Sequence, residues 1–322
     1  MTAWWHKLSY QLGRLGTSRH QRRIHYIKAE MVGLRRQIAA LLELAGASEA
    51  RRVSNLPDQA PLQEAEFKVY SQFGDDGIIQ YLISHLSENP TFVEFGVEDY
   101  TEANTRFLLV HNRWRGLILD GRPDLAAVVA EQGLPMLYEL QAKSAFITAE
   151  NINQLISEAG FSGEIGLLSI DIDGNDYWVW KAITCVRPQI VVVEYNAVFG
   201  PDRAVTIPYS PAFTRQQAHY SWLYFGASLP ALCALGEEKG YAFVGCNEAG
   251  NNAYFVRKDL ADHFLVLAPQ SGFRDSRFRE SRDPQGRMDR LTGPARLEAI
   301  ADLPVVDLAL GQVIPLRKLL PQ

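Results

Sequence analysis

The chain has 322 residues, of which 47% are hydrophobic and 21% are charged, so it can bury one large core and still leave room for short appendages. Its formal net charge of −5 argues against nucleic acid as a partner, because neutralising phosphates requires a broad basic face. Three scattered cysteines argue against a zinc knuckle or a disulfide framework, and neither a signal peptide nor an apolar run of about 20 residues is evident. These features predict a globular protein of the cytoplasm.

Residues 1–60 are predicted to form a helical arm that ends in a linker. Between residues 24 and 45, apolar side chains recur at alternating spacings of three and four: Ile24, Ile27, Met31, Leu34, Ile38, Leu41 and Ala45. This heptad pattern favours a short coiled coil that would join chains into a homo-oligomer, but it also fits one amphipathic helix packed on its own domain. Residues 46–65 are rich in Ala, Ser, Pro and Asp, which indicates the linker.

The first part of the arm has a different character, because residues 1–29 contain six basic residues and no acidic one. Apolar residues lie among the basic ones: Trp4, Trp5, Leu8, Leu12 and Leu15. Such a composition suits a helix that lies in a membrane interface. Peripheral contact with the inner face of a membrane is therefore a second expectation for the arm.

Residues 61–260 alternate between strand-like and helix-like segments. Strands are expected at residues 91–97, 116–120, 136–140, 165–171 and 189–195, and helices at 77–86, 105–112, 124–132, 149–159 and 228–239. This alternation predicts an α/β fold with a Rossmann-like doubly wound sheet. Residues 241–246 and 253–257 flank a turn, so the sheet should finish with an antiparallel hairpin, as in the methyltransferase variant of this fold.

Residues 261–322 form a C-terminal extension of mixed charge. Six arginines and four acids stand between residues 274 and 290. Most such segments are solvated surfaces, but arginines of this kind can also grip a carboxylate or phosphate of a bound molecule. The extension is therefore a candidate part of a substrate site.

The first strand of this domain ends with Glu94 and a turn at Gly96. Nucleotide-like ligands bind at such carboxyl ends of strands. A dinucleotide fingerprint would also need glycine at positions 98 and 101, where the chain has Glu98 and Thr101. The Glu98 carboxylate would repel a diphosphate, whereas the sulfonium and ammonium groups of S-adenosylmethionine are cationic. The turn thus favours S-adenosylmethionine, although a purely structural glycine is an alternative.

The second strand ends with Asp120, 24 positions after Gly96. A carboxylate at about this offset can accept hydrogen bonds from ribose hydroxyls. The alternative is that Asp120 only caps the turn before Gly121. Together with the first turn, the pattern predicts a site for an adenosyl ligand.

Several carboxylates follow the next two apolar strands. Strand alternation would put Ser169, Asp171 and Asp173 on one face, and Glu194 and Asn196 follow the neighbouring strand. Like charges so placed repel one another unless they are solvated, protonated or bridged by a cation. Asp173, Glu194 and Asn196 are therefore candidate ligands for magnesium or calcium. Hydrogen bonds to loop backbone and to the donor, without a metal, would serve equally well.

Residues 67–257 resemble the FkbM-type methyltransferases and their relatives, which modify sugars, glycolipids and polyketide hydroxyls. The resemblance rests on three segments: Tyr70–Gly77, Phe92–Gly96 and Ser169–Asp176. It implies these donor contacts: Ser71 and Gln72 closing over the donor, Glu94 and Gly96 at its amino-acid moiety, Asp120 at its ribose and Phe146 over its adenine. Asp171 and Asp173 would face the reaction centre. Glu98 and Tyr100 depart from the family, because many methyltransferases have glycine there.

The sequence thus predicts an S-adenosylmethionine-dependent O-methyltransferase acting on a hydroxyl of a glycan or sugar-containing metabolite, with a divalent cation such as Mg²⁺ as an optional helper. An oxygen nucleophile must lose its proton, and the candidate bases are Asp173 and His219, although His219 also suits a packed or surface role. Two rivals stay open. One is a metal-dependent glycosyltransferase that uses Asp171 and Asp173, and the other is a non-catalytic Rossmann-like scaffold.

Overall fold

The structure is a computed structural model, and it describes residues 2–87 and 89–319. The side chains of residues 2–22, 28, 29, 32, 35 and 36 lie outside the described set. The chain divides into two compact units, Met1–Ser48 and Glu49–Gln322. Each unit is described by itself.

The first unit is one helix, which confirms the helical arm. Helix α1 (Thr2–Val53) runs through it and ends in the second unit. Six large heptad side chains between Ile24 and Leu41 are 41% to 65% exposed. The association that they predict stays a prediction. The side chains of the five upstream apolar residues, from Trp4 to Leu15, lie outside the described set.

The structure bears on two further expectations: where the linker of the arm begins, and whether any helix could cross a membrane. Residues 46–53 continue α1, so the linker begins later than expected. This segment contains the good helix formers Ala, Glu and Arg, and the first proline is Pro57, so nothing in it stops a helix. Among the described residues, no helix combines the length and apolar content needed to cross a bilayer.

The second unit is built on a seven-stranded sheet with the order β3-β2-β1-β4-β5-β8-β7. Its strands are β1 (Thr91–Phe95), β2 (Arg115–Asp120), β3 (Leu140–Ser144), β4 (Gly163–Ile170), β5 (Val186–Glu194), β7 (Tyr241–Cys246) and β8 (Asn252–Arg257). Strands β1 to β5 pair in parallel, whereas β8 is antiparallel to both β5 and β7. The predicted doubly wound sheet with a terminal antiparallel hairpin is confirmed.

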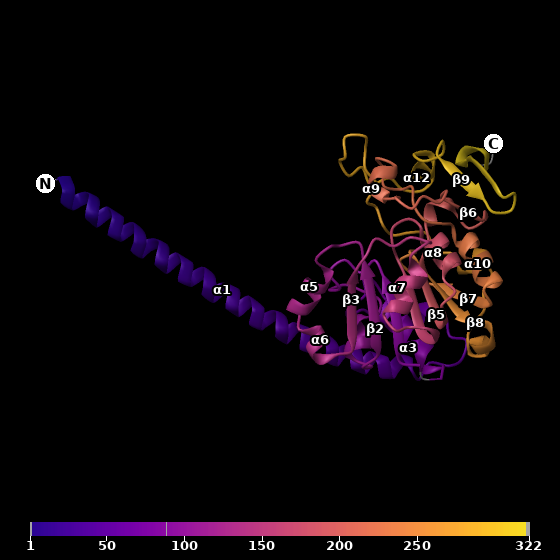
Figure 1. The fold of residues 1–322 in the computed structure, drawn as a ribbon, viewed down its shortest axis with the longest axis horizontal. Helices are drawn as coiled ribbons and strands as arrows, with labels where there is room; N and C mark the ends of the chain where they lie inside the picture. The colour runs from indigo at the N-terminus through magenta and orange to yellow at the C-terminus, as the bar shows by residue number, and fades with distance from the viewer. Residues whose placement is uncertain (1, 88, 320–322) are drawn as a thin grey trace. The chain divides into compact units, whose positions relative to one another are not determined.

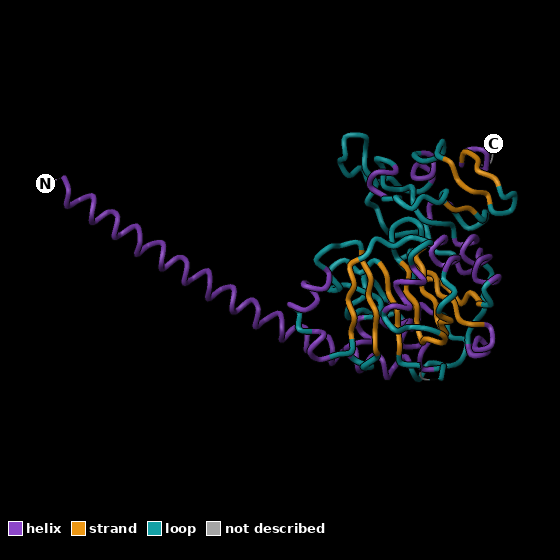
Figure 2. The backbone as a smooth tube through the Cα atoms, in the orientation of Figure 1, coloured by secondary structure: helices purple, strands orange, loops and turns teal. Residues whose placement is uncertain are grey.

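Helices cover both faces of this sheet (Figures 1 and 2). One face packs on α7 (Ile152–Glu158), α8 (Asp176–Ala182) and α10 (Leu229–Glu238). The other packs on α3 (Asp75–Ser84), α4 (Arg106–Val110) and α5 (Leu125–Glu131). Successive strand side chains point to opposite faces, so Ile190 joins the second core and Val191 the first. The central strands are apolar throughout because both of their faces are buried.

One predicted strand is wrong. Of the residues expected as a strand at 136–140, Met136 and Leu137 belong to a short helix, α6 (Leu134–Leu137), and the third strand, β3, begins only at Leu140. Met136 and Leu137 are 87% and 69% exposed, so their apolar character does not mark a buried element. Strand β3 is at the edge of the sheet, where polar residues are tolerated, and this hides it in the sequence.

A second, smaller layer lies beyond the carboxyl ends of the parallel strands (Figure 1). Its three-stranded sheet has the order β10-β9-β6, with β6 (Val205–Thr206), β9 (Pro304–Asp307) and β10 (Gln312–Pro315). We call residues 197–227 and 274–319 the cap. It contains η1 (Ala197–Phe199), α9 (Arg215–Ala218), α12 (Pro294–Glu298) and η3 (Leu316–Leu319) around its own apolar core. Short helices elsewhere in the unit are α2 (Leu62–Ala65), η2 (Lys258–His263) and α11 (Pro269–Gly272).

Candidate functional site

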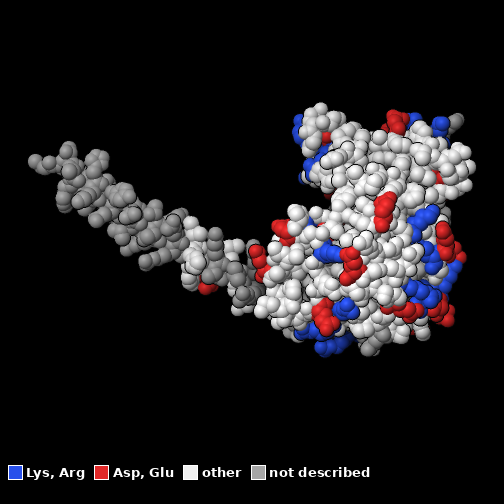
Figure 3. Space-filling view, in the orientation of Figure 1, with Lys and Arg blue, Asp and Glu red and all other residues white. Residues whose placement is uncertain are grey.

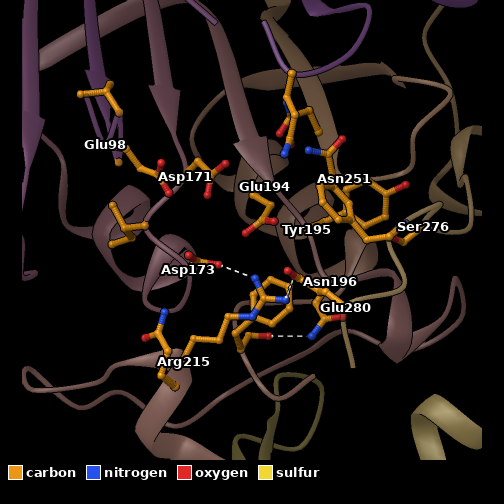
Figure 4. Close-up of a pocket in the computed structure, with 18 of the residues that line it drawn as sticks. Glu98, Asp171, Asp173, Glu194, Tyr195, Asn196, Arg215, Asn251, Ser276 and Glu280 are labelled. Carbon is orange, nitrogen blue, oxygen red and sulfur yellow. Dashed lines mark hydrogen bonds and ion pairs between the residues drawn. The ribbon is translucent and has the colours of Figure 1, made fainter. Parts of the chain in front are cut away.

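A cavity of about 790 Å³ lies between the carboxyl ends of the strands and the cap. Its floor includes residues at and after the ends of β1 to β5, together with Gln72 and residues 250–252, and its roof includes cap residues 213–225 and 276–296. The sheet order reverses between β1 and β4, which is where doubly wound sheets bind ligands. Figure 4 shows the labelled floor and cap side chains converging on this space.

The turn after β1 places backbone close to the cavity. Gly96 has φ +72°, and a Cβ atom there would lie 1.5 Å from the carbonyl oxygen of Asp171. Glu98 and Tyr100 have φ values of +50° and +63°, in the left-handed region that glycine adopts most easily. The two departures from glycine therefore leave the turn in a glycine-like conformation. Such positions store strain that the surrounding structure must hold.

Glu94, in β1, holds the segment after this turn through hydrogen bonds. Its buried carboxylate accepts hydrogen bonds from the backbone N–H groups of Asn104 (2.9 Å) and Thr105 (3.1 Å), and from the Thr105 hydroxyl. The Tyr100 hydroxyl lies 3.0 Å from the same Thr105 oxygen. Burial raises the pKa of Glu94 to about 7. Glu94 also lines the cavity, so it both fixes the turn and faces the site.

Asp120 and Phe146 lie together at one end of the cavity. Asp120 accepts a hydrogen bond from the backbone N–H of Glu98 (2.8 Å) on one oxygen and from that of Arg122 (2.7 Å) on the other. Each carboxylate oxygen keeps further acceptor capacity. The Phe146 ring is 50% exposed and lines the same cavity. The cavity thus offers an acceptor for hydroxyls beside an open aromatic surface.

The two polar residues expected to close over a ligand have different positions. Gln72 lines the cavity, whereas Ser71 is fully buried and is not among the lining residues. The Ser71 hydroxyl donates to Asp76 (2.9 Å), which also accepts from three successive backbone N–H groups, those of Val69, Tyr70 and Ser71. Ser71 therefore stabilises the turn that carries Gln72. Asp76 was not predicted from the sequence, where its one signal is an acid in the first turn of a helix that follows Tyr70 and Phe73.

The carboxylates of Asp171, Asp173 and Glu194 come together as predicted. One oxygen of each lies within 4.8 Å of the others. Burial, followed by the neighbouring carboxylates, holds the pKa values of Asp171 and Glu194 well above their usual range. Glu194 Oε2 is shielded and has no hydrogen-bond partner among the described residues. Two of the three acids thus lack a full counter-charge.

Arg215 is the residue at this cluster that sequence reasoning missed. Its Nη1 donates to Asp173 Oδ1 (2.6 Å), its Nη2 pairs with Glu280, and its Nε donates to the carbonyl oxygen of Trp222 (2.7 Å). Its guanidinium also stacks 4.0 Å from the centre of the Phe225 ring. A fixed cation therefore stands where the sequence suggested a metal ion. No periodic pattern could have located it, because it begins the four-residue helix α9, 42 positions from Asp173.

Asn196 lines the cavity but its amide is engaged elsewhere. Its nitrogen donates to the carbonyl oxygens of Leu223 (2.9 Å) and Phe225 (3.0 Å), and its oxygen accepts from the N–H of Val198 (3.0 Å). Asn196 thus ties the cap loop to the end of β5. The carboxylates that could share a cation are Asp171, Asp173 and Glu194, two of which are among the expected ligands.

His219 is not brought to the cavity. Its Nδ1 lies 2.8 Å from the Ser221 hydroxyl, and burial lowers the pKa of its ring. No histidine occurs among the described residues that line the cavity. The alternative of a packed role for His219 therefore fits its surroundings better than the role of a base.

Comparisons with known proteins give only general likenesses. No family model and no curated protein matches the sequence. Among solved structures, an S-adenosylmethionine-dependent methyltransferase from Clostridium acetobutylicum has a TM-score of 0.37 and 8% identity, covering 57% of this chain and 90% of that one. The N-terminal domain of EvdMO1 with SAH bound has a TM-score of 0.38 and 11% identity, covering 69% and 94%.

A third similar structure is an O-methyltransferase family protein from Burkholderia thailandensis, with a TM-score of 0.34 and 12% identity over 63% of this chain and 59% of that one. TM-scores below 0.5 give no support to a particular activity or substrate. The fold is established by the strand order and register of the chain itself.

Proposed function

We propose that the protein is an S-adenosylmethionine-dependent O-methyltransferase that acts on a hydroxyl of a glycan or sugar-containing molecule. The observation that carries the proposal is that the β1 turn, Asp120 and the acid cluster face one cavity at the point where the strand order reverses. The cavity volume of about 790 Å³ suits S-adenosylmethionine together with a second small molecule.

The residues of the floor fit the donor part by part. Gly96 permits close approach of backbone, and the spare acceptor capacity of Asp120 suits ribose hydroxyls. The open ring of Phe146 suits a purine face, because aromatic rings favour stacking. Asp171 and Glu194 suit a ligand with positive charge, since a cation would relieve their mutual repulsion.

When bound, the donor would supply an electrophilic methyl group on a positively charged sulfur, and it would leave as S-adenosylhomocysteine. The chain must orient the acceptor oxygen and remove its proton. Asp171 is the best placed base, because it lines the cavity, its carboxylate accepts no hydrogen bond from the described residues, and its pKa is raised. Arg215 holds Asp173 and leaves Asp171 free to take the proton.

The metal-assisted form of this function would use Asp171, Asp173 and Glu194, whose oxygens suit Mg²⁺. Because Arg215 already pairs with Asp173, we favour a site in which this guanidinium and the cationic donor balance the acids. Chelation tests the choice. Loss of turnover that Mg²⁺ restores would support the metal-assisted form, and unchanged turnover in a chelator would exclude it.

The test of donor binding is calorimetry with S-adenosylhomocysteine on the full chain. Asp120→Ala should weaken its binding by about 1–3 kcal/mol, because ribose hydroxyls would lose their partner. Asp124→Ala is the matched control: Asp124 is four residues away, pairs with Arg122, is exposed and does not line the cavity. Binding of a UDP-sugar without binding of S-adenosylhomocysteine would instead support the glycosyltransferase.

A further inference from the structure

Charges are segregated across the cavity. All but one of the acidic residues that line it belong to the floor, between Glu94 and Glu194, and the exception is Glu280. All three basic lining residues belong to the cap: Arg215, Arg279 and Arg296. In Figure 3, Lys and Arg side chains lie at the edge of the upper lobe beside the hollow, and acidic side chains lie at the top of the same lobe. The roof therefore offers positive charge opposite an acidic floor.

Arg215 is already paired, but Arg296 is not well satisfied. The Arg296 side chain is buried, with 7% exposure, and it lines the cavity. Its side chain makes polar contacts with other described residues only through Nη1, which lies 3.4 Å from the Ser276 carbonyl oxygen and 3.5 Å from Asp275 Oδ1. Nε and Nη2 have no partner among the described residues, and neither is fully shielded from solvent. A guanidinium has five N–H donors, so most of those of Arg296 lack a partner among the described residues.

Arg279 adds a second unpaired cation at the same roof. It is exposed, lines the cavity, and makes no salt bridge or hydrogen bond with the described residues. Burial and the nearby positive charges of Arg215 and Arg279 lower the pKa of Arg296, against the opposing effect of Asp275. Two like charges that approach each other over a cavity are costly unless an anion enters between them.

The position of these arginines favours the acceptor over the donor. The Tyr195 hydroxyl donates to the carbonyl oxygen of Arg274 (2.6 Å), so the segment that carries Ser276 lies against the end of β5. The donor features, in contrast, follow β1 and β2, and β4 separates β1 from β5. The acid cluster lies between, at the ends of β4 and β5.

We propose that Arg296 and Arg279 bind an anionic group of the acceptor, a carboxylate or a phosphate. The proposal rests on the methyltransferase function proposed above. The acceptor would then be an acidic sugar or a phosphorylated sugar derivative, with its anionic group at the roof and its reactive hydroxyl directed to Asp171 at the floor. Arginine suits such groups because its planar fork can donate two parallel hydrogen bonds.

The experiment uses inorganic phosphate and acetate as probes, titrated into the full chain saturated with S-adenosylhomocysteine at constant ionic strength. At least one anion should bind with saturation, and the stronger of the two identifies the class of group. Arg296→Gln and Arg279→Gln should each weaken it about tenfold, the equivalent of about 1.4 kcal/mol. Arg296→Lys should recover binding only in part. Arg203→Gln is the matched control, because Arg203 is exposed in the cap but does not line the cavity.

Other outcomes would contradict either the proposal of an anion site or the methyltransferase function on which it rests. Absence of saturable anion binding, or equal binding in all variants, would overturn the proposal. If Arg279→Gln weakens S-adenosylhomocysteine and anions compete with it, the arginines hold the donor's own carboxylate and the proposal fails while the methyltransferase function stands. If S-adenosylhomocysteine does not bind the native chain at all, the proposed function itself fails. Arg279→Gln changes an exposed side chain, so the test does not depend on how Arg296 variants fold.

Discussion

The floor and the cap hold their charged groups in opposite ways. Asp171 and Glu194 end rigid parallel strands, yet they lack counter-charges, and their proximity is imposed by the register of β4 and β5. Arg215 and Arg296 lie on two short helices of the cap, α9 and α12, and backbone carbonyl oxygens help to hold them. The sheet therefore holds negative charges close together at an energetic cost, while the cap supplies positive charge from short helices on the opposite side of the cavity.

The largest expected effect is a loss of stability at Gly96, where the turn after β1 approaches the backbone of Asp171 most closely. Gly96→Ala should lower the free energy of unfolding by about 3 kcal/mol or more, because its Cβ would overlap the Asp171 carbonyl oxygen in a left-handed conformation. Denaturant unfolding measures the loss. Gly121→Ala is the matched control, since a Cβ there would meet only Phe146 at 3.8 Å. Equal stability of both variants would mean that the turn adapts and does not constrain the floor.

The second expected effect tests whether the negative charge held at the strand ends lowers stability. Glu194→Gln should raise the free energy of unfolding by about 1–3 kcal/mol at pH 8, because it removes a buried carboxylate without a counter-charge. The raised pKa of Glu194 fixes the sign: above its usual value of about 4, the folded state retains a proton that the unfolded state has lost, so stability falls as pH rises toward the folded pKa. The gain should therefore shrink toward pH 4.

Thermal unfolding at both pH values measures this difference. The exposed Asp202→Asn serves as a control and should show no pH-dependent gain. A gain for Glu194→Gln that is the same at pH 4 and pH 8 would show that Glu194 is not a charged group whose burial costs stability.

The smallest expected effect on the cavity comes from the arm, because the described residues that line the cavity belong to the second unit. Deleting residues 1–48 should leave the affinity for S-adenosylhomocysteine unchanged while lowering the mass measured by light scattering. We expect this because the exposed heptad side chains bury little apolar surface unless they meet a second chain. An unchanged mass would show that the arm does not associate chains.

The sequence predicted the floor better than the cap, and the reason is geometric. A strand fixes where its last side chain points, so Asp120, Asp171 and Glu194 could be assigned to one edge from their positions alone. The cap depends on contacts between distant segments, such as that of Arg215 with Asp173 and Glu280, which leave no periodic signal. Ser71 and His219 are not among the residues that line the cavity, and the sequence could not show this, because long-range packing sets their distance from it.

The most direct measurement of the central claim is a crystal structure of the full chain grown with S-adenosylhomocysteine. The account predicts adenine at Phe146, ribose hydroxyls on Asp120, and the sulfur directed to Asp171, with the space beneath Arg296 left open for the acceptor. A ligand that lies with its adenine at Arg296, or that binds outside the cavity, would contradict the assignment of the floor to the donor and of the cap to the acceptor.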